Sequence, residues 1–403
     1  MMSARQHSSA QGTLLLVLVC ILLIIGHFAR PFVYRSGDID IYQSIAENVW
    51  KAEDLLKSEY PPLTSALFAL MHPPALSIPF PDAWSAFLTV ACVAAAAWAA
   101  WTCSPREGCI VLLSILATML LLGLDITWGR YDLLVGMLLL LTLVAHRRRK
   151  FAASGLFLLL ATGLKLVPIV LLPVVYTMTD ADARRHVVKG AIAGTAIAVL
   201  VPLLVLGPAA VIENALSMVL YHAGRGVQLE STWSGLSILW EVLHGHRATV
   251  LFLHRSHENA EVWKSIPLLS TVLGLVGLCG LFRGLSRAND IAPAMLCVLA
   301  WLLFLSPVLS PQYISWLLPL LVAWGAAEFT AGRPSRLTIA ALCIGVGIGL
   351  LTNWFYLPLY LNLVDTQDVL PVLVLNLRNA LLLIFAIACY RAKLSRSRRT
   401  SVG

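Results

Sequence analysis

Charged residues are scarce in this chain. They make up 12% of its 403 residues, whereas soluble domains carry about 25%. Repeated apolar runs of membrane-spanning length accompany this shortage of charge. The sequence therefore predicts an all-α polytopic membrane protein and excludes an ordinary soluble enzyme.

Several motifs of nucleotide and metal enzymes are also missing. The chain has no glycine-rich phosphate loop, no dinucleotide fingerprint, no nucleophile elbow and no zinc-protease histidine pair. Its basic residues lie in short clusters between apolar runs, which indicates membrane topology and not nucleic-acid binding. The eight cysteines lie within apolar runs or at their ends, so we expect no disulfide framework. We assign no residue to a metal and leave a divalent cation open as a cofactor.

The apolar runs predict a series of membrane spans. The first run is too long for a signal-peptide core, so we expect a retained anchor. The spans are expected near residues 13–33, 83–102, 109–125, 131–146, 187–206, 264–282, 291–305, 313–330, 336–351 and 371–390.

One further run, at 151–179, is too long for a single span and is interrupted by Lys165 and Pro168. The basic clusters at 147–150 and 184–189 lie on the same side of the membrane only if this run enters and returns. We therefore predict a hairpin of two short helices with Lys165 near its turn. The total is about twelve transmembrane or re-entrant helices, with both termini cytoplasmic.

This topology predicts one membrane domain over residues 1–403 with two long outer segments, at 34–82 and 207–263. Within 34–82, apolar residues at helical spacing from Ile41 to Ala52 predict an interfacial helix. The prolines after Tyr60 would end it and begin a second short helix. Polar and aromatic residues gather on this outer face, which favours an extracytoplasmic active site.

Two carboxylates, Asp38 and Asp40, follow the first apolar run directly. A carboxylate at a membrane surface can act as a general base toward an acceptor hydroxyl. It can equally stabilise the start of the helix that follows, where aspartate is common. The residues alone leave both interpretations open.

Three cations are candidates for binding an anion. Placing the charged side chain of Lys165 at mid-membrane costs roughly 2.5–3.5 kcal/mol. A buried anion would offset this cost, whereas snorkelling of the side chain to the membrane interface would avoid it. Arg130 suits bidentate phosphate binding and could equally form a salt bridge with Asp132 or Asp125. Arg378, near the outer end of the last span, is a further candidate. The expected substrate-lining residues are Tyr42, Tyr60, Asp132, Tyr221, His222, Gln312 and Tyr313.

The order of several short motifs resembles the GT-C glycosyltransferases. More closely, it resembles the bacterial polyprenol-phosphate-mannose-dependent alpha-mannosyltransferases, a family once labelled a domain of unknown function. The motifs that carry the resemblance are Gly37-Asp38-x-x-x-Tyr42, Tyr60-Pro61-Pro62-Leu63, Gly129-Arg130-Tyr131-Asp132, Gly163-Leu-Lys165-Leu-Val-Pro168 and Ser310-Pro311-Gln312-Tyr313.

The resemblance implies an inverting transfer at the inner membrane of a bacterium. The donor would be an outer-leaflet polyprenyl-phosphate hexose, most simply mannose, and the acceptor a glycolipid or glycan outside the cytoplasm. It implies Asp38 as general base, with Asp40 as the alternative, and Lys165, Arg130 and Arg378 as donor-phosphate ligands. The alternative function is a flippase or transporter of lipid-linked sugars, whose usual internal repeats are absent from this sequence.

Overall fold

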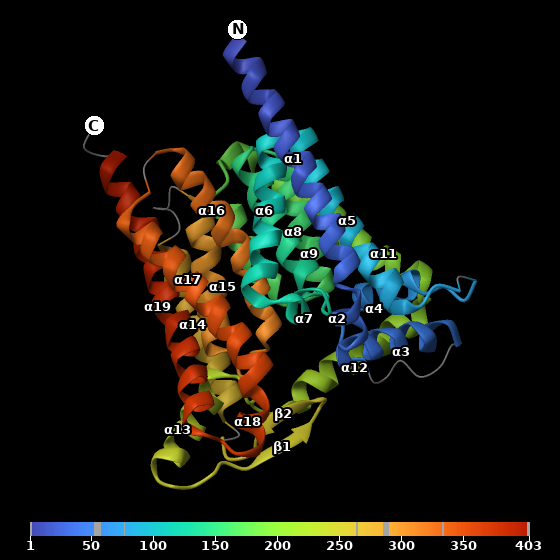
Figure 1. Cartoon of the computed structure of the whole chain (residues 1–403), viewed down its shortest axis with the longest axis vertical. Helices are drawn as coiled ribbons and strands as arrows, with labels where there is room; N and C mark the ends of the chain where they lie inside the picture. Colours follow the sequence, from blue (N-terminus) through green and yellow to red (C-terminus); the bar gives the residue numbers. More distant parts are fainter. Residues whose placement is uncertain are drawn as a thin grey trace. The chain divides into compact units, whose positions relative to one another are not determined.

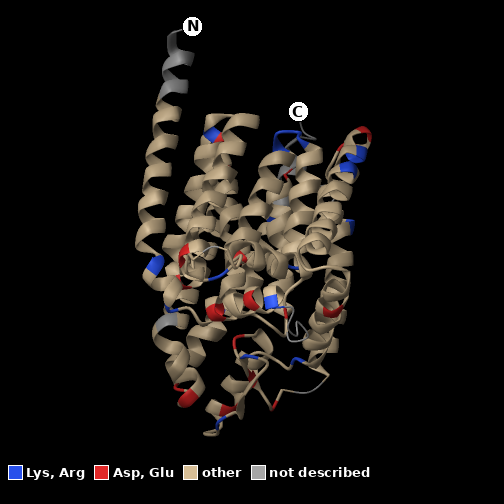
Figure 2. Ribbon diagram, turned by 90° about the vertical axis from the view of Figure 1, so that its right-hand side faces the viewer, with Lys and Arg blue, Asp and Glu red and all other residues tan. Residues whose placement is uncertain are grey.

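The computed structural model describes residues 2–51, 58–75, 77–262, 265–284, 290–332 and 334–400. The chain divides into two compact units, Met1–Ala223 and Gly224–Gly403. Each unit is built almost wholly from helices (Figure 1), and charged residues are sparse along these helices (Figure 2). Because a helix satisfies its own backbone hydrogen bonds, this is the architecture that an apolar chain adopts in lipid.

Among the described residues, eight segments are long and apolar enough to cross a membrane. They are Ala10–Tyr34, Phe80–Thr102, Pro105–Leu122, Ala181–Val205, Ile266–Arg283, Pro311–Thr330, Arg336–Trp354 and Val369–Ala392. Shorter apolar helices include Phe151–Leu164, Val167–Thr177 and Ile291–Leu305. The predicted fold class, an all-α polytopic membrane protein, is confirmed.

The first unit contains the helices that surround the candidate site. In chain order they are α1 Met2–Phe28, α2 Arg30–Tyr34, α3 Gly37–Lys51, α4 Pro62–Met71, α5 Phe80–Thr102, α6 Pro105–Leu122, α7 Leu124–Thr127, α8 Asp132–Arg147, α9 Phe151–Leu164, η1 Val167–Leu171, α10 Leu172–Thr177, η2 Ala181–Ala183, α11 Arg184–Val205 and α12 Pro208–Gly224. The two short helices predicted for the first outer segment are α3 and α4, and proline opens the second. Ala52, the last residue of the first predicted helix, lies outside the described residues.

The run at 151–179 folds back on itself, as expected for a hairpin of two short helices. Helix α9 begins beside His146, whose ring lies 5.3 Å from the Phe151 ring between centroids. The chain then breaks at Lys165, forms η1 and α10, and ends with Thr179 Oγ1 3.1 Å from His146 Nε2. Both ends of the run therefore meet the same histidine.

Helices α9 and α11 consequently run parallel and in direct contact. Gly190 lies against Ala152 and Gly194 lies against Leu156, so the two helices run in the same direction. A side chain at Gly190 would collide with the Ala152 carbonyl, and one at Gly194 would lie 2.7 Å from the Leu156 oxygen. Small residues at this spacing let membrane helices approach closely.

The second unit follows a separate order of elements. They are α13 Thr232–Leu243, β1 Val250–Leu253, β2 Ser256–Asn259, α14 Ile266–Arg283, α15 Ile291–Leu305, η4 Pro311–Trp316, α16 Leu318–Thr330, α17 Arg336–Trp354, the π-helical η5 Phe355–Leu359, α18 Tyr360–Asp365 and α19 Val369–Thr400. The segment 207–263, which the sequence predicts to be an outer loop, contains α12, α13 and a β-hairpin that the sequence did not predict. Strands β1 and β2 pair antiparallel, and His254 and Arg255 at their turn have positive φ.

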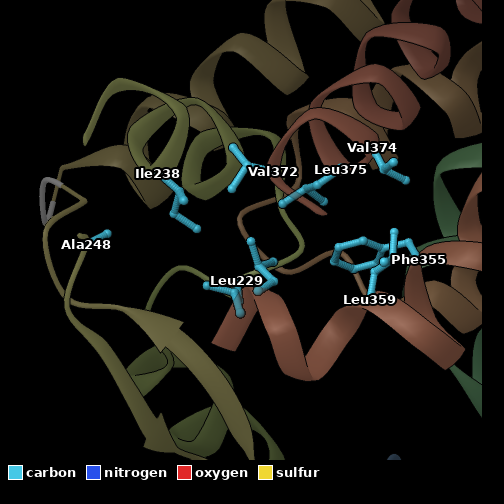
Figure 3. Packing of buried hydrophobic residues seen from close by; sticks show 9 residues of the cluster. Leu229, Ile238, Ala248, Phe355, Leu359, Val372, Val374 and Leu375 are labelled. Carbon is cyan, nitrogen blue, oxygen red and sulfur yellow. The ribbon is translucent and has the colours of Figure 1, made fainter. Parts of the chain in front are cut away.

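A buried apolar cluster fixes the start of this unit. Leu229 and Ile238 pack there with Phe355, Val372 and Leu375, which come from the far end of the chain (Figure 3). The side chain of Ser231 accepts a hydrogen bond from the Ser234 N–H and so caps α13. The segment before α13 is therefore held in place by the packing of Leu229 and by the helix cap that Ser231 forms.

We predict that Gly190→Ala destabilises the chain. The added methyl group collides with the Ala152 carbonyl, and such overpacking costs about 1–3 kcal/mol. Thermal unfolding of the protein in lipid nanodiscs should show a lower Tm. The matched control is Gly280→Ala in α14, where an added methyl meets nothing within 4 Å. Equal losses in the two variants would contradict the packing argument.

Candidate functional site

Two loops of the first unit lie against each other and bring the candidate residues together. Ser36, just before α3, donates a hydrogen bond from Oγ to the Gly129 carbonyl at 3.1 Å. A Cβ at Gly129 would lie 2.8 Å from the Ser36 Cβ. This close approach, which only glycine permits at this position, aligns the residues that follow in each loop.

Asp38 and Arg130 are those residues, and they form an ion pair. Arg130 Nη1 lies 3.1 Å from Asp38 Oδ2, with 12% and 24% of the two side chains exposed. Asp40, two residues along the same first turn of α3, is exposed. The two carboxylates are therefore in different environments, because residues at this spacing point in different directions on a helix.

A second ion pair joins Lys165 to Asp132. Lys165 Nζ donates to Asp132 Oδ1 at 3.0 Å, and the Asp132 side chain is only 1% exposed. Asp132 opens α8, where the helix dipole favours a negative charge. Lys165 therefore has an anionic partner, as one of the two interpretations expected, and this partner is a carboxylate of the chain itself.

Pro168 explains why the chain breaks at Lys165. Proline lacks the N–H that would bond to the carbonyl four residues earlier, which belongs to Leu164. Thr64 of α4 takes that place, because its hydroxyl donates to the Leu164 carbonyl at 2.7 Å. The broken helix end is thus satisfied inside an apolar region, and the Lys165 side chain can leave the helix axis and reach Asp132.

Tyr131 lies between these two ion pairs and belongs to an aromatic cluster. Its ring lies 5.0 Å from Lys165 Nζ, a distance at which an ammonium group interacts with a ring face. Its centroid is 5.4 Å from that of Tyr60 and 5.9 Å from that of Tyr42. The cluster is completed by Phe68 and Trp84.

Tyr42 is held in its neutral form. Burial raises the pKa of its hydroxyl well above the usual value, and the charges of Asp38 and Asp132 raise it further. A phenol with such a pKa does not serve as a base near neutral pH. A carboxylate is therefore a better candidate for a base in this region than Tyr42.

Trp128 connects this cluster to the first two long helices. Its indole N–H donates to Ser85 Oγ at 3.0 Å, and Ser85 donates to the Gly26 carbonyl of α1 at 3.0 Å. Its own carbonyl accepts from the Trp84 indole at 2.8 Å. Trp128 is fully buried, so this network fixes the turn that carries Arg130. Our sequence predictions assigned no role to Trp128.

Tyr221 and His222 lie at the end of α12, also in the first unit. Their rings contact each other edge-on at 5.4 Å, and His222 Nε2 is 3.3 Å from the Glu59 carbonyl. On the same helix, Ser217 donates to the Ser58 carbonyl at 3.2 Å. Helix α12 therefore supports the segment that leads into Tyr60.

The remaining candidates belong to the second unit. Gln312 is buried in η4, and the half-buried Tyr313 stacks on Trp316 at 4.6 Å between ring centroids. Arg378 is buried in α19, where it donates to the Glu230 carbonyl at 2.5 Å and to Asn379 Oδ1. Within the described part of the chain, no group of three or more His, Cys, Asp or Glu side chains is placed to hold a metal ion.

A comparison with protein families decides the class of this protein. The sequence model described as "Glycosyltransferase family 87" matches residues 59–307, which is more than half of the chain. The chain belongs to glycosyltransferase family 87. It is therefore a membrane glycosyltransferase of the GT-C type, and the alternative of a transporter is set aside.

The family match includes Tyr60, Arg130 and Lys165, whereas Asp38 and Arg378 lie outside the matched residues. No curated protein matches the chain. The roles of individual residues therefore depend on the geometry described above.

We predict that Lys165→Met lowers the free energy of unfolding by about 3–5 kcal/mol, because it leaves the buried Asp132 carboxylate without its ammonium partner. Adding Asp132→Asn should restore part of this loss in a double-mutant cycle. Denaturation of the purified protein measures both values. The control is Arg149→Met, which removes an exposed ion pair with Asp180 and should change stability little. Additive effects of the two site substitutions would show that the pair is not coupled.

Proposed function

We propose that this glycosyltransferase moves a hexose, most simply mannose, from a polyprenyl-phosphate donor to a glycan or glycolipid outside the cytoplasm. The observation that carries the proposal is the Asp38–Arg130 ion pair beside Lys165. It combines a partly exposed carboxylate with two cations at the edge of an apolar helix bundle. Such a set suits a phosphate leaving group and a hydroxyl acceptor.

An apolar cavity supports a lipid-linked donor. Its volume is about 230 Å³, and its lining includes Leu63, Leu134 and Leu164. Leu164 directly precedes Lys165, and Leu134 follows Asp132 by two residues. A phosphate near Lys165 would therefore have apolar space beside it for the first part of an isoprenoid chain, whereas a nucleotide would gain nothing from such a wall.

Arg130 and Lys165 are the proposed phosphate ligands. In the structure each of them contacts a carboxylate, Asp38 and Asp132 respectively. A donor phosphate would offer both cations oxygen atoms that carry more charge, and it would compete with these carboxylates. Turning Arg130 toward phosphate would release Asp38, so the base would become available when the donor is bound.

The proposed transfer then follows in one displacement. The acceptor hydroxyl gives its proton to Asp38 while its oxygen forms a bond to the anomeric carbon of the sugar. The bond from this carbon to the phosphate oxygen breaks, and polyprenyl phosphate leaves with the electron pair. Arg130 and Lys165 stabilise the charge that grows on the phosphate. Attack on the face opposite the leaving group inverts the anomeric centre.

The distribution of basic residues supports an extracytoplasmic site. Helix α8 begins at Asp132 and ends at Arg147, and its 16 residues extend over about 24 Å. The basic cluster that follows Arg147 marks a cytoplasmic end. Asp132 and the residues around it would therefore lie near the opposite face of the membrane, with both chain termini in the cytoplasm.

We predict that Asp38→Asn lowers the rate of sugar transfer by roughly 10²–10⁴-fold, the range of general-base catalysis. Donor binding should persist, because the uncharged amide of the variant leaves Arg130 available to the phosphate. Single-turnover assays with labelled polyprenyl-phosphate mannose measure the rate, and direct titration measures donor binding. Asp40→Asn is the matched control and should stay close to the wild-type rate, since Asp40 is exposed. A fast Asp38→Asn enzyme would remove the basis for this mechanism.

The orientation predicts that a reporter placed after Asp180 lies in the cytoplasm and one placed after Gly207 lies outside. These positions flank α11, which is a single candidate span. Alkaline phosphatase fusions, active only outside the cytoplasm, distinguish the two locations. Activity at Asp180 with none at Gly207 would reverse the proposed topology.

A further inference from the structure

An apolar groove in the first unit is not used by the mechanism above. It is lined by α9, by α11 and by the returning arm of the hairpin, η1 and α10, and its volume is about 860 Å³. Leu159 and Val187 line it and are buried, whereas Tyr176, Val188 and Ile192 line it with 39%, 44% and 64% of their surface exposed. None of the residues that line it is charged. The groove is therefore apolar and opens to the surroundings of the helices.

The surroundings of this groove are lipid. Val188 and Ile192 belong to the candidate membrane span Ala181–Val205, so hydrocarbon fills the space beside them. The part of α11 that lines the groove, from Val187 to Ala196, extends over about 15 Å. This is half of the roughly 30 Å hydrocarbon core of a bilayer. The groove therefore has the length of one lipid chain in one leaflet.

Two arginines lie at one end of the groove. Arg184 and Arg185 begin α11 and precede Val188 by four and three residues, so they lie on the helix face that lines the groove. The guanidinium carbon of Arg184 is 5.1 Å from the ring centroid of Tyr176, and its Nε donates to the Thr179 carbonyl at 3.2 Å. These contacts hold the Arg184 side chain where the groove begins, and a guanidinium group has further N–H donors for a ligand.

The charge at this end of the groove is positive. Arg185 and Lys189 are both exposed. Of the two carboxylates in the preceding turn, Asp180 already pairs with Arg149 at 2.7 Å, which leaves Asp182. The start of a helix also favours an anion. A lipid with an anionic headgroup therefore gains electrostatic attraction at this place, whereas a lipid with a neutral headgroup does not.

This end is remote from the proposed donor-phosphate ligand Lys165. Helix α9 begins beside His146, which also meets Thr179, the residue that Arg184 contacts. Lys165 follows the opposite end of α9, whose 14 residues extend over about 21 Å. One phosphate group cannot contact both Arg184 and Lys165. The anion that suits the arginines is therefore the headgroup of a second lipid.

We propose that this groove binds one acyl chain of an anionic phospholipid whose phosphate contacts Arg184 and Arg185. The proposal goes beyond the proposed function and does not depend on it. The bound chain fills the space between α10 and α11 and supports the returning arm of the hairpin. Because such a lipid binds only the folded protein, it stabilises the fold.

The headgroup is tested by native mass spectrometry of the detergent-solubilised protein. The probes are phosphatidylglycerol and phosphatidylcholine with the same acyl chains. The wild-type protein should bind phosphatidylglycerol at least tenfold more tightly, and this lipid should raise its Tm. Arg184→Gln and Arg185→Gln should each weaken phosphatidylglycerol binding about fivefold and leave phosphatidylcholine binding unchanged. Arg185 is exposed, so its variant folds even if loss of the Arg184 contacts proves disruptive.

The matched control for the headgroup is Arg283→Gln. Arg283 is an exposed basic residue at the end of another candidate span, α14. Its variant should bind phosphatidylglycerol as tightly as the wild type. An equal loss in Arg283→Gln and Arg185→Gln would show a general effect of positive charge and would overturn the proposed site.

The acyl-chain site is tested by filling the groove with Ile192→Trp. If the new ring displaces two methylene groups of the chain, binding of both phospholipids should weaken about tenfold. The control is Leu204→Trp on the same helix, because Leu204 is 85% exposed and does not line the groove. It should bind both lipids as the wild type does.

Three further outcomes would overturn the proposal. Equal affinity of the wild-type protein for the two phospholipids would show an ordinary lipid-facing surface. Displacement of phosphatidylglycerol by an equimolar amount of polyprenyl phosphate would assign the groove to the isoprenoid chain of the donor. Displacement by inorganic phosphate, with no effect of Ile192→Trp, would show an anion site that does not use the groove.

Discussion

The first unit depends on one buried ion pair, between Lys165 and Asp132. Neither charge is tolerated in an apolar bundle by itself, because each loses its hydration. Lys165 reaches Asp132 only because Pro168 ends α9 early and Thr64 satisfies the carbonyl that proline leaves open. One missing N–H group therefore determines where the helix ends, where the lysine lies, and which face of Tyr131 meets a positive charge.

The pair also explains the course of the chain around it. Helix α9 ends at Leu164, and the chain returns through α10 to the level of His146. The following helix α11 then runs parallel to α9, with glycines at their contacts. Close helix contact is the main source of stability where lipid tails and side chains are equally apolar. The local break is thus compensated by packing between two continuous helices.

The sequence was sufficient for features that repeat along the chain or follow from charge counting. It predicted the long apolar helices, the fold-back of the run 151–179 and the two short helices that follow the first apolar run, because apolar periodicity and basic clusters are local signals. It did not predict the pairing of Arg130, which was expected to bind phosphate or to form a salt bridge with Asp132 or Asp125. Arg130 instead meets Asp38, far away in the chain. Contacts such as Ser36 with Gly129 leave no local pattern, and the β-hairpin was too short to give a strand signal.

The hydrogen-bond network at Trp128 makes the first helix, α1, part of the support for the candidate site. Ser85 donates to the carbonyl of Gly26 and accepts from the indole that supports the Arg130 turn. The backbone of α1 is thus part of the scaffold beneath the ion pairs, and its side chains matter less than its position. Another sequence could therefore replace helix α1 only if it placed a backbone carbonyl where the Gly26 carbonyl accepts from Ser85. For protein engineering, fusion partners belong before α1, and a replacement of this helix by an unrelated membrane anchor must keep its register.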